Sequence, residues 1–231
     1  MRYLALACDY DGTLAFDGKV GEEPLAALQG VLASGRRLVL VTGRQLDDLM
    51  EVFPHLNLFE RVVAENGALL YRPHTREERR LAEPPPDELV AALRERGVEP
   101  LSVGRTIVAT CQPYERTVLE VFRQLGLGHQ VVRNRESVMV LPPGVDKGTG
   151  LKAALDEMGL PPQKMVGIGD AENDIAFLSL CGSSAAVANA LPKVKETVDI
   201  VTRGAYGSGV VELIDLLLAD DLKDVRAATA R

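Results

Sequence analysis

The sequence predicts an α/β protein with a doubly wound, Rossmann-like parallel sheet that carries a smaller α+β unit as an insertion. Short apolar runs alternate with amphipathic segments of helical period over residues 1–72, and this rhythm returns from residue 144. Between them, residues 73–143 start with a charged, proline-rich stretch and follow a different rhythm. Alternating strands and helices are typical of a parallel sheet covered on both faces, and the change in composition indicates an inserted unit.

The composition is that of an ordinary globular protein. The 231 residues are 46% hydrophobic with a mean hydropathy of +0.04, enough to bury a full core. A net charge of -7 argues against a nucleic-acid partner, because binding to a phosphate backbone rests on clustered Lys and Arg. Apolar runs are too short for a signal peptide or a membrane span. We therefore expect small-molecule partners and no membrane, and the sequence leaves the oligomeric state open.

The cysteines point to a reducing compartment. Cys8, Cys111 and Cys181 lie far apart, with no CxxC pair and no Cys/His ligand spacing. Neither a disulfide framework nor a zinc site is expected. The cytoplasm fits this pattern.

Two strand-helix units and a hairpin are expected in the first 72 residues. In order, these are a strand at 3–9, a helix at 22–35, a strand at 36–44, a helix at 46–53, and a strand within 61–72 that passes into the hairpin. The first helix has Pro24 in its first turn and Gly35 where it ends. Asn66-Gly67 is expected to form a two-residue hairpin turn.

The middle of the chain is expected to form the inserted unit. Residues 73–86 are interpreted as a surface connection. They precede a helix at 87–97, a strand at 105–111, a helix at 113–126, and strands at 130–134 and 137–142. We accordingly divide the chain into a core of residues 1–72 and 144–219, an inserted α+β unit of residues 73–143, and a polar tail of residues 220–231.

The core rhythm resumes in the last third of the chain. The expected elements are a helix at 146–159, a strand at 165–170, a helix at 173–180, a strand at 184–189 and a closing helix at 208–218. In the closing helix, Val210, Leu213, Ile214 and Leu217 share one face. The tail has no strong periodicity, so the sequence also allows this chain to be one module of a larger protein.

Acidic side chains follow two of the expected strands. Asp9 and Asp11 come at the carboxyl end of the first strand, the edge where open α/β sheets bind ligands. Asp170 closes a later strand, and Asp174 follows one helical turn on. If these strands are neighbours, four carboxylates converge. Two like charges about 4 Å apart repel by roughly 4 kcal/mol at an effective dielectric near 20, so such a cluster needs a counter-charge.

Two kinds of cation fit that cluster. Lys147 supplies one, and Mg²⁺ is the other, since a hard cation prefers oxygen ligands where His and Cys are absent. Thr42 and Gly43 close the second strand and offer a hydroxyl and backbone amides at the same edge. Amides, a hydroxyl, a lysine and a metal are what a phosphoryl group requires.

The chain resembles the haloacid dehalogenase (HAD) phosphohydrolases. The resemblance rests on "DYDGTL", "VTGR", Lys147 in "DKGTG", and "GDAEND", in that order, and it spans nearly the whole chain. An insertion between the second and third motifs resembles the type-2 cap of subfamily IIB, the Cof-type branch that includes sugar-phosphate and phosphoglycolate phosphatases. "AENGA" at residues 64–68 is also typical of that branch.

The resemblance implies a Mg²⁺-dependent phosphomonoesterase that acts on a small phosphorylated metabolite, with the first strand central in the sheet. Asp9 matches the nucleophile that becomes an aspartyl phosphate, and Asp11 matches the acid and base. Mg²⁺ would be held by Asp9, the backbone carbonyl of Asp11, and Asp170, with Asp174 as a further ligand. Thr42, Gly43 and Lys147 would bind the phosphoryl oxygens, and Asn173 would orient that shell.

Other functions stay open on sequence alone. A phosphosugar mutase would use the same aspartyl phosphate but pass it to a second sugar hydroxyl. A receiver-type signalling domain also has an acidic pocket with a Thr and a Lys, although receivers lack a cap. A phosphate-binding module without catalysis is the third alternative.

Some residues allow two interpretations. For Arg44 a structural ion pair and a substrate contact are equally favoured. Glu65 and Asn66 are candidates for contact with substrate or with the cap hinge. In the cap, Arg105, Arg133 and Arg135 are candidates for binding an anionic or polyhydroxylated substrate.

Overall fold

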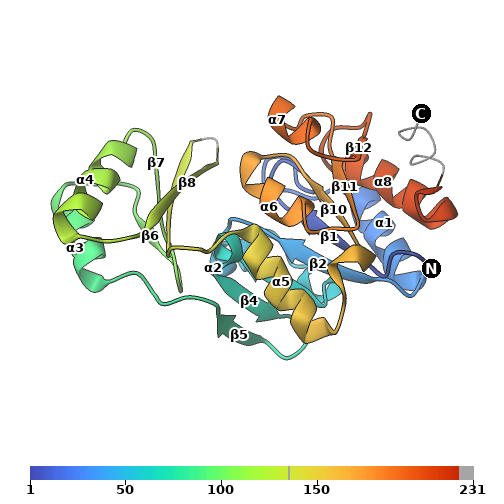
Figure 1. The fold of residues 1–231 in the computed structure, drawn as a ribbon, viewed down its shortest axis with the longest axis horizontal. Helices are drawn as coiled ribbons and strands as arrows, with labels where there is room; N and C mark the ends of the chain where they lie inside the picture. The colour runs from blue at the N-terminus through green and yellow to red at the C-terminus, as the bar shows by residue number, and fades with distance from the viewer. Residues whose placement is uncertain (135, 224–231) are drawn as a thin grey trace.

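The computed structural model describes residues 1–134 and 136–223. The described residues form two sheets, one of eight strands and one of four. The larger sheet and its helices lie at one end of the elongated molecule and the smaller sheet lies at the other (Figure 1). The α/β fold predicted from the sequence is confirmed. The described residues include no helix with the length and apolar character needed to cross a bilayer.

The strand β1 (Ala5–Asp9) lies inside the larger sheet, between β10 (Met165–Gly169) and β2 (Arg37–Val41). The complete order is β12-β11-β10-β1-β2-β3-β4-β5, which adds β12 (Ile200–Val201), β11 (Ser183–Ala186), β3 (Arg61–Ala64), β4 (Leu69–Arg72) and β5 (Glu77–Arg80). Neighbouring strands from β12 to β3 pair in parallel, and the pairs β3-β4 and β4-β5 are antiparallel. The carboxyl ends of β1, β2 and β10 therefore meet at one edge, as expected.

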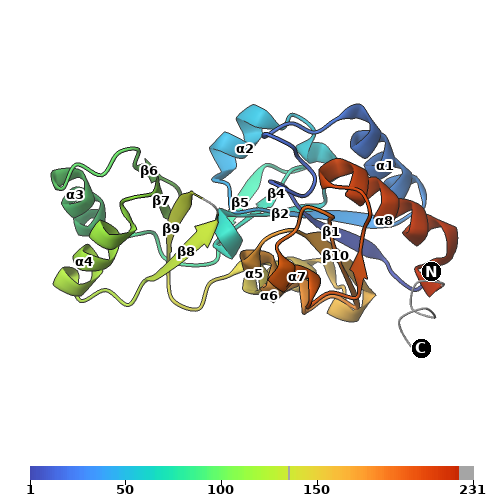
Figure 2. The ribbon, with the colours of Figure 1, turned by 90° about the horizontal axis from the view of Figure 1, so that it is seen from above.

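Helices cover both faces of this sheet (Figure 2). One face carries α1 (Glu22–Ala33), α2 (Leu46–Val52) and α8 (Tyr206–Asp220), and the other carries α5 (Lys147–Met158), α6 (Ile175–Leu178) and α7 (Pro192–Lys195). All five residues of β1 are buried, because a strand in the middle of such a sheet has no face in water. Its apolar side chains belong to the main hydrophobic core.

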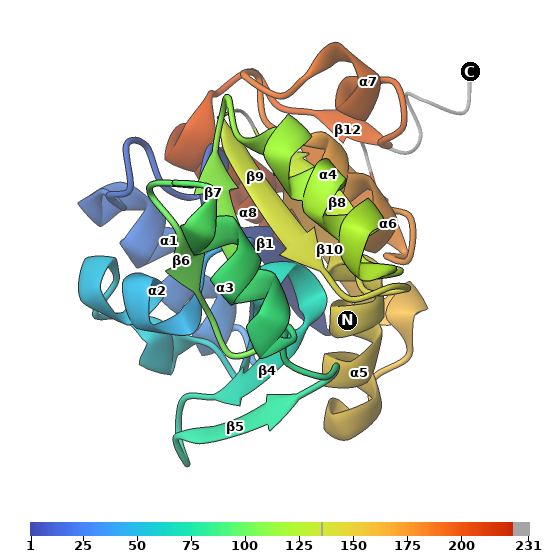
Figure 3. The ribbon, with the colours of Figure 1, turned by 90° about the vertical axis from the view of Figure 1, so that its left-hand side faces the viewer.

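The smaller sheet is antiparallel, with the order β6-β7-β9-β8. Its strands are β6 (Ser102–Val103), β7 (Val108–Cys111), β8 (Gln130–Asn134) and β9 (Ser137–Leu141). The helices α3 (Asp87–Glu95) and α4 (Glu115–Leu125) pack on its outer face, away from the larger sheet (Figure 3). This leaves the inner face directed at the rest of the molecule.

The turn between β3 and β4 differs from its prediction. Ala64 pairs with Leu69, so four residues form the connection rather than the two-residue turn at Asn66-Gly67. Residues Glu65–Gly67 form a short 3-10 turn, and the side chains of Glu65 and Asn66 bond to residues distant in sequence. These long-range contacts override the local preference of an Asn-Gly pair.

The structure also contains short elements that the sequence did not indicate. They are β5, β6, β12, α7 and further 3-10 turns at Leu56–Leu58, Pro162–Lys164 and Glu172–Asp174. β5 reads "EERR" and all four of its residues are exposed, so no apolar alternation marks it as a strand. It extends the larger sheet from within residues 73–86, which we had interpreted as a surface connection. The core and cap boundaries stay a prediction, and residues 224–231 of the expected tail lie outside the described residues.

A carboxylate on α5 ties that helix to three strands. Glu157 accepts hydrogen bonds from Arg61 on β3 at 3.0 Å, Arg72 on β4 at 3.0 Å and Arg79 on β5 at 2.9 Å. The hydrogen bond from Arg72 has the largest effect on the pKa of Glu157. With those from Arg79 and Arg61 it outweighs burial and lowers the pKa of Glu157 from 4.5 to about 2.

Glu157→Gln should lower the free energy of unfolding at neutral pH by about 1 kcal/mol, a value that allows for solvent screening of a surface network. Because the folded-state pKa is depressed, this stabilisation is complete above 4.5 and is lost as the pH falls toward about 2. Urea unfolding of both proteins at several pH values measures the difference. Asp156→Asn, which removes an exposed pair with Lys152, is the matched control. A difference that does not shrink in acid would contradict the prediction.

Candidate active site

The candidate site lies where β1, β10 and the start of α5 meet. Asp9 is the last residue of β1, and Lys147 is the first residue of α5. Asp146 caps this helix, since its side chain accepts from the amide of Thr149 at 2.7 Å and the Thr149 hydroxyl accepts from the amide of Asp146 at 3.0 Å. The helix start also passes close to the β3-β4 turn. A Cβ on Gly67 would lie 1.8 Å from the carbonyl oxygen of Asp146, so only glycine fits there.

Lys147 links two carboxylates inside the protein. Its ammonium donates to Asp9 Oδ1 at 2.6 Å and to Asp174 Oδ1 at 2.6 Å. The three side chains are 1%, 4% and 0% exposed, in the order Lys147, Asp9, Asp174. Charges this deeply buried are tolerated only when they are paired, so removal of any one leaves the others uncompensated.

The strand end of β10 orients Asp174. Asp174 Oδ2 accepts from the backbone amides of Asp170 and Ala171, each at 2.9 Å. A Cβ on Gly169 would lie 2.7 Å from the same oxygen, so the glycine makes room for the carboxylate. The buried Asp170 accepts from the hydroxyl of Thr13 at 3.3 Å. Sequence reasoning did not single out Thr13, although it lies within the "DYDGTL" motif.

The electrostatics follow from burial and from the neighbouring charges. Burial, and then repulsion from Asp174, raise the pKa of Asp9 well above its usual value, against the opposing charge of Lys147. Burial by itself would lower the pKa of Lys147, but the charges of Asp174 and Asp9 outweigh it and raise that pKa. Lys147 therefore stays an ammonium ion, while the negative charge around Asp9 exceeds what one lysine compensates.

Three of the four expected carboxylates lie together. Oxygens of Asp9, Asp170 and Asp174 lie within 4.8 Å of one another, and all three residues are buried. Asp9 Oδ2 is buried and has no hydrogen-bond partner among the described residues. Three buried carboxylates whose oxygens lie this close together are a donor set for a hard cation such as Mg²⁺.

The fourth carboxylate, that of Asp11, bonds elsewhere. Its two oxygens accept from Arg44 Nε at 2.6 Å and Arg44 Nη2 at 2.7 Å. The remaining arm of the guanidinium, Nη1, donates to Asp48 at 2.6 Å. The expected convergence therefore does not extend to the side chain of Asp11, because Arg44 offers it a bidentate partner. For Arg44 the ion-pair interpretation is the one that the geometry shows.

The remaining predicted residues lie near the same edge of the sheet. Thr42 is fully buried just after β2, where its hydroxyl accepts from the amide of Arg44 at 3.0 Å. Asn173 donates to Asn66 at 3.0 Å. A Cβ on Gly43 would lie 3.5 Å from Met139 Sδ on the inner face of the smaller sheet. Met139 therefore covers this part of the site, a contact that nothing in the sequence indicated.

Glu65 fastens the smaller sheet to the larger one. Its carboxylate is 0% exposed and accepts from three consecutive residues in the turn before β7. The donors are the amides of Arg105, Thr106 and Ile107, at 2.9, 2.7 and 3.2 Å, and the hydroxyl of Thr106 at 2.7 Å. The partners lie in the middle of the inserted unit, so this contact is neither of the two that we expected for Glu65, with substrate or with the cap hinge.

Of the three cap arginines proposed for substrate binding, the two that the structure describes are engaged with carboxylates. Arg105 pairs with Asp47 on α2 and Glu78 on β5, which adds to the docking of the smaller sheet. Arg133 pairs with Glu115 on α4. Arg135, the third cap arginine proposed for substrate binding, lies outside the described residues.

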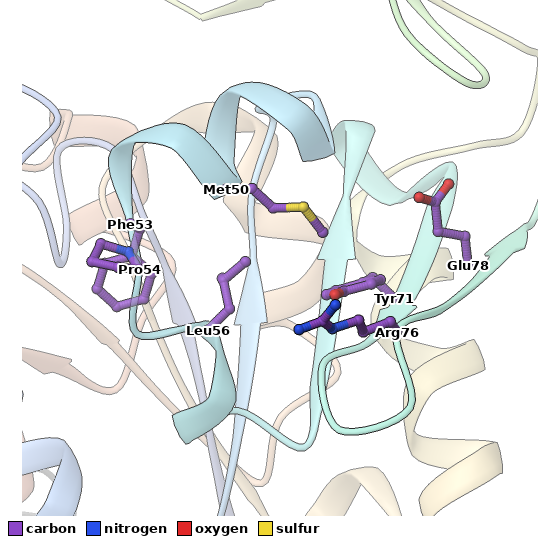
Figure 4. A pocket seen from close by; sticks show the side chains of 7 residues that line it. All are labelled: Met50, Phe53, Pro54, Leu56, Tyr71, Arg76 and Glu78. Carbon is purple, nitrogen blue, oxygen red and sulfur yellow. The ribbon is translucent and has the colours of Figure 1, made fainter.

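A surface pocket of about 370 Å³ lies away from the carboxylates (Figure 4). Its lining consists of Met50, Phe53, Pro54, Leu56, Tyr71, Arg76 and Glu78. Tyr71 pairs with Val62, near the start of β3, which places this pocket toward the opposite edge of the sheet. The pocket is therefore separate from the candidate site.

Comparison with known proteins identifies the relatives of this chain. A family model described as haloacid dehalogenase-like hydrolase matches residues 6–109 and 107–214. A phosphoglycolate phosphatase from Methanothermobacter thermautotrophicus is 31% identical, over 91% of this chain and 96% of that protein. A haloacid dehalogenase-like hydrolase from Bacteroides thetaiotaomicron has a similar fold, with a TM-score of 0.76, 20% identity, and coverage of 93% of this chain and 99% of that one. A HAD subclass IIB sugar phosphatase superposes with a TM-score of 0.73 and 19% identity, covering 91% and 97% of the two chains.

Glu65→Ala should loosen the docking of the smaller sheet, because it leaves the donors of residues 105–107 without their buried acceptor. Hydrogen bonds to a charged group contribute about 1.5–3 kcal/mol each, so amide exchange across residues 104–107 should accelerate at least about tenfold. Hydrogen-deuterium exchange with mass spectrometry measures this. The exposed Glu95, replaced by Ala, is the control. Unchanged protection of residues 104–107 would argue against Glu65 as the fastening residue.

Proposed function

Since the chain belongs to the haloacid dehalogenase-like hydrolases, we propose that it is a phosphomonoesterase that forms an aspartyl phosphate on Asp9. It is a phosphatase of the HAD type, subclass IIB. The observation that carries the proposal is the buried Asp9 carboxylate, held by Lys147 on one oxygen and unpartnered on the other among the described residues. The unpartnered oxygen is the one available to attack phosphorus.

The proposed reaction has two steps. In the first, Asp9 Oδ2 bonds to phosphorus, the bond from phosphorus to the leaving oxygen breaks, and Asp11 gives its proton to that oxygen. In the second, water gives a proton to Asp11 and bonds to phosphorus, and the bond between Asp9 Oδ2 and phosphorus breaks to release phosphate. Lys147, Thr42 and the amide of Gly43 would bind the phosphoryl oxygens, and Asn173 would orient the surrounding groups.

The donor set at the site fits Mg²⁺. Asp9 and Asp170 would hold the ion with their carboxylates and Asp11 with its backbone carbonyl, while Asp174 would complete the set directly or through water. When bound, Mg²⁺ supplies a positive charge that compensates the phosphoryl oxygens and the clustered carboxylates.

We propose a small phosphorylated metabolite as the substrate, of the phosphoglycolate or sugar phosphate class. Support comes from the relatives named phosphoglycolate phosphatase and from the fold shared with a sugar phosphatase. Residues 73–143 would act as a cap, with the inner face of the smaller sheet selecting the leaving group. We place the protein in the cytoplasm, a reducing compartment in which its three free cysteines persist as thiols.

Phosphate release from phosphoglycolate, sugar phosphates and p-nitrophenyl phosphate, with and without Mg²⁺, tests the proposal. We expect release to require the metal and Asp9→Asn to reduce it by at least about 1,000-fold, because the covalent step is lost. Asp17→Asn, an exposed neighbour, is the control. Turnover that survives Asp9→Asn would refute the aspartyl phosphate. Transfer to a second sugar hydroxyl without free phosphate would instead indicate a mutase.

A further inference from the structure

Arg44 lies outside the groups to which the proposed reaction assigns a role, yet it binds the side chain on which both steps depend. Its guanidinium takes both oxygens of Asp11 in a bidentate pair. In this arrangement Asp11 does not share the pocket of Asp9, Asp170 and Asp174.

Arg44 is itself held firmly in place. Its amide donates to the Thr42 hydroxyl at 3.0 Å, and its carbonyl accepts from the amide of Glu65 at 2.9 Å. The third arm of its guanidinium donates to Asp48 on the first turn of α2, and the guanidinium lies over the ring of Tyr10, 5.5 Å from the centroid. The guanidinium of Arg44 is a planar fork of N–H donors, and these contacts hold it in place. It therefore fixes the plane and the position of the carboxylate that it binds.

Asp11 would have a different environment without this fork. Its side chain is 37% exposed, so packing alone does not fix its rotamer. General acid catalysis requires the acid within hydrogen-bond reach of the leaving oxygen, and a displacement of about 1 Å is enough to lower the rate about 100-fold. A free carboxylate near a metal-binding cluster is also drawn toward the cation. The fork opposes both kinds of movement.

We propose that Arg44 is a positioning residue that holds Asp11 at the mouth of the site as the proton donor to the leaving group. The inference rests on the proposed function, in which Asp11 is the acid. Arg44 and Lys147 then divide the acidic groups between them: Lys147 compensates Asp9 and Asp174, and Arg44 compensates Asp11. When Asp11 carries the proton that it donates, one of its oxygens would hold that proton toward the leaving group and the other would keep its hydrogen bond to Arg44. The other carboxylates serve as nucleophile and as candidate metal ligands.

The leaving group provides the test. The kcat/KM value reports steps up to departure of the leaving group, so it is independent of the later hydrolysis of the aspartyl phosphate. An alkoxide leaving group needs a proton, whereas p-nitrophenolate leaves without one. A residue that acts through the acid should therefore matter for alkyl phosphates and much less for p-nitrophenyl phosphate.

We expect Arg44→Met to lower kcat/KM for an alkyl phosphate, phosphoglycolate or a hexose phosphate, by about 10- to 100-fold. The fall for p-nitrophenyl phosphate should be about threefold or less, as the acid is dispensable there. Asp11→Asn should show the same selectivity, and the double variant should be no worse than Asp11→Asn alone. Arg44→Lys keeps the positive charge but not the planar guanidinium. Its kcat/KM for the alkyl phosphate should therefore fall nearly as far as that of Arg44→Met.

The ratio of the two kcat/KM values does not depend on how much protein is folded, so a variant that folds poorly still gives a result. Arg116→Met, which removes an exposed arginine paired with Glu120, is the matched control. Equal falls on both substrates, or additive losses in the double variant, would overturn the role of Arg44 while leaving the phosphatase intact. A wild-type protein inactive on both substrates would contradict the proposed function and this inference with it.

Discussion

The ion pairs of Lys147 with Asp9 and Asp174 are the constraint on which the candidate site depends. Three charges with almost no contact with water are stable only as a set. The fold around them meets that requirement locally: the strand end of β10 gives two amides to Asp174, and the start of α5 brings the ammonium to within 2.6 Å of both carboxylates.

The approach of α5 depends in turn on residues without side chains. A Cβ on Gly148 would lie 2.9 Å from the backbone of Ala176, and one on Gly150 would lie 2.5 Å from Val63. These glycines let the first turn of α5 press against α6 and β3, which brings Lys147 into the sheet edge. The "DKGTG" motif thus places a charge because its glycines allow a close approach, and the lysine alone would not suffice.

The sequence predicted the sheet and the group at its edge because those features depend on strong local patterns. The buried strands are largely apolar, and Asp9, Asp170 and Asp174 lie at or just after strand ends, so neighbouring parallel strands bring them together. The position of the Asp11 side chain could not be predicted, because its partner Arg44 is 33 residues away and competes with the carboxylate cluster for it. The β3-β4 turn differed from its prediction for a similar reason: Glu65 and Asn66 serve distant partners.

The smaller sheet covers the edge of the larger sheet at which the charged groups lie, and this strengthens their interactions. Met139 lies against Gly43, and the turn held by Glu65 lies beside the loop that carries Arg44, since the amide of Glu65 bonds to the carbonyl of Arg44. Excluding water from this edge strengthens each charge interaction within it, as the local dielectric falls. Under the proposed function a phosphorylated substrate has to reach Asp9, which is only 3% exposed here, so some of the contacts around this edge have to open first. The contact between the two parts is polar at Glu65 and Arg105 and apolar where Ala68 packs with Ile107, Met139 and Leu141. Water can replace the polar contacts when the sheets separate, so the apolar cluster is the part that resists opening.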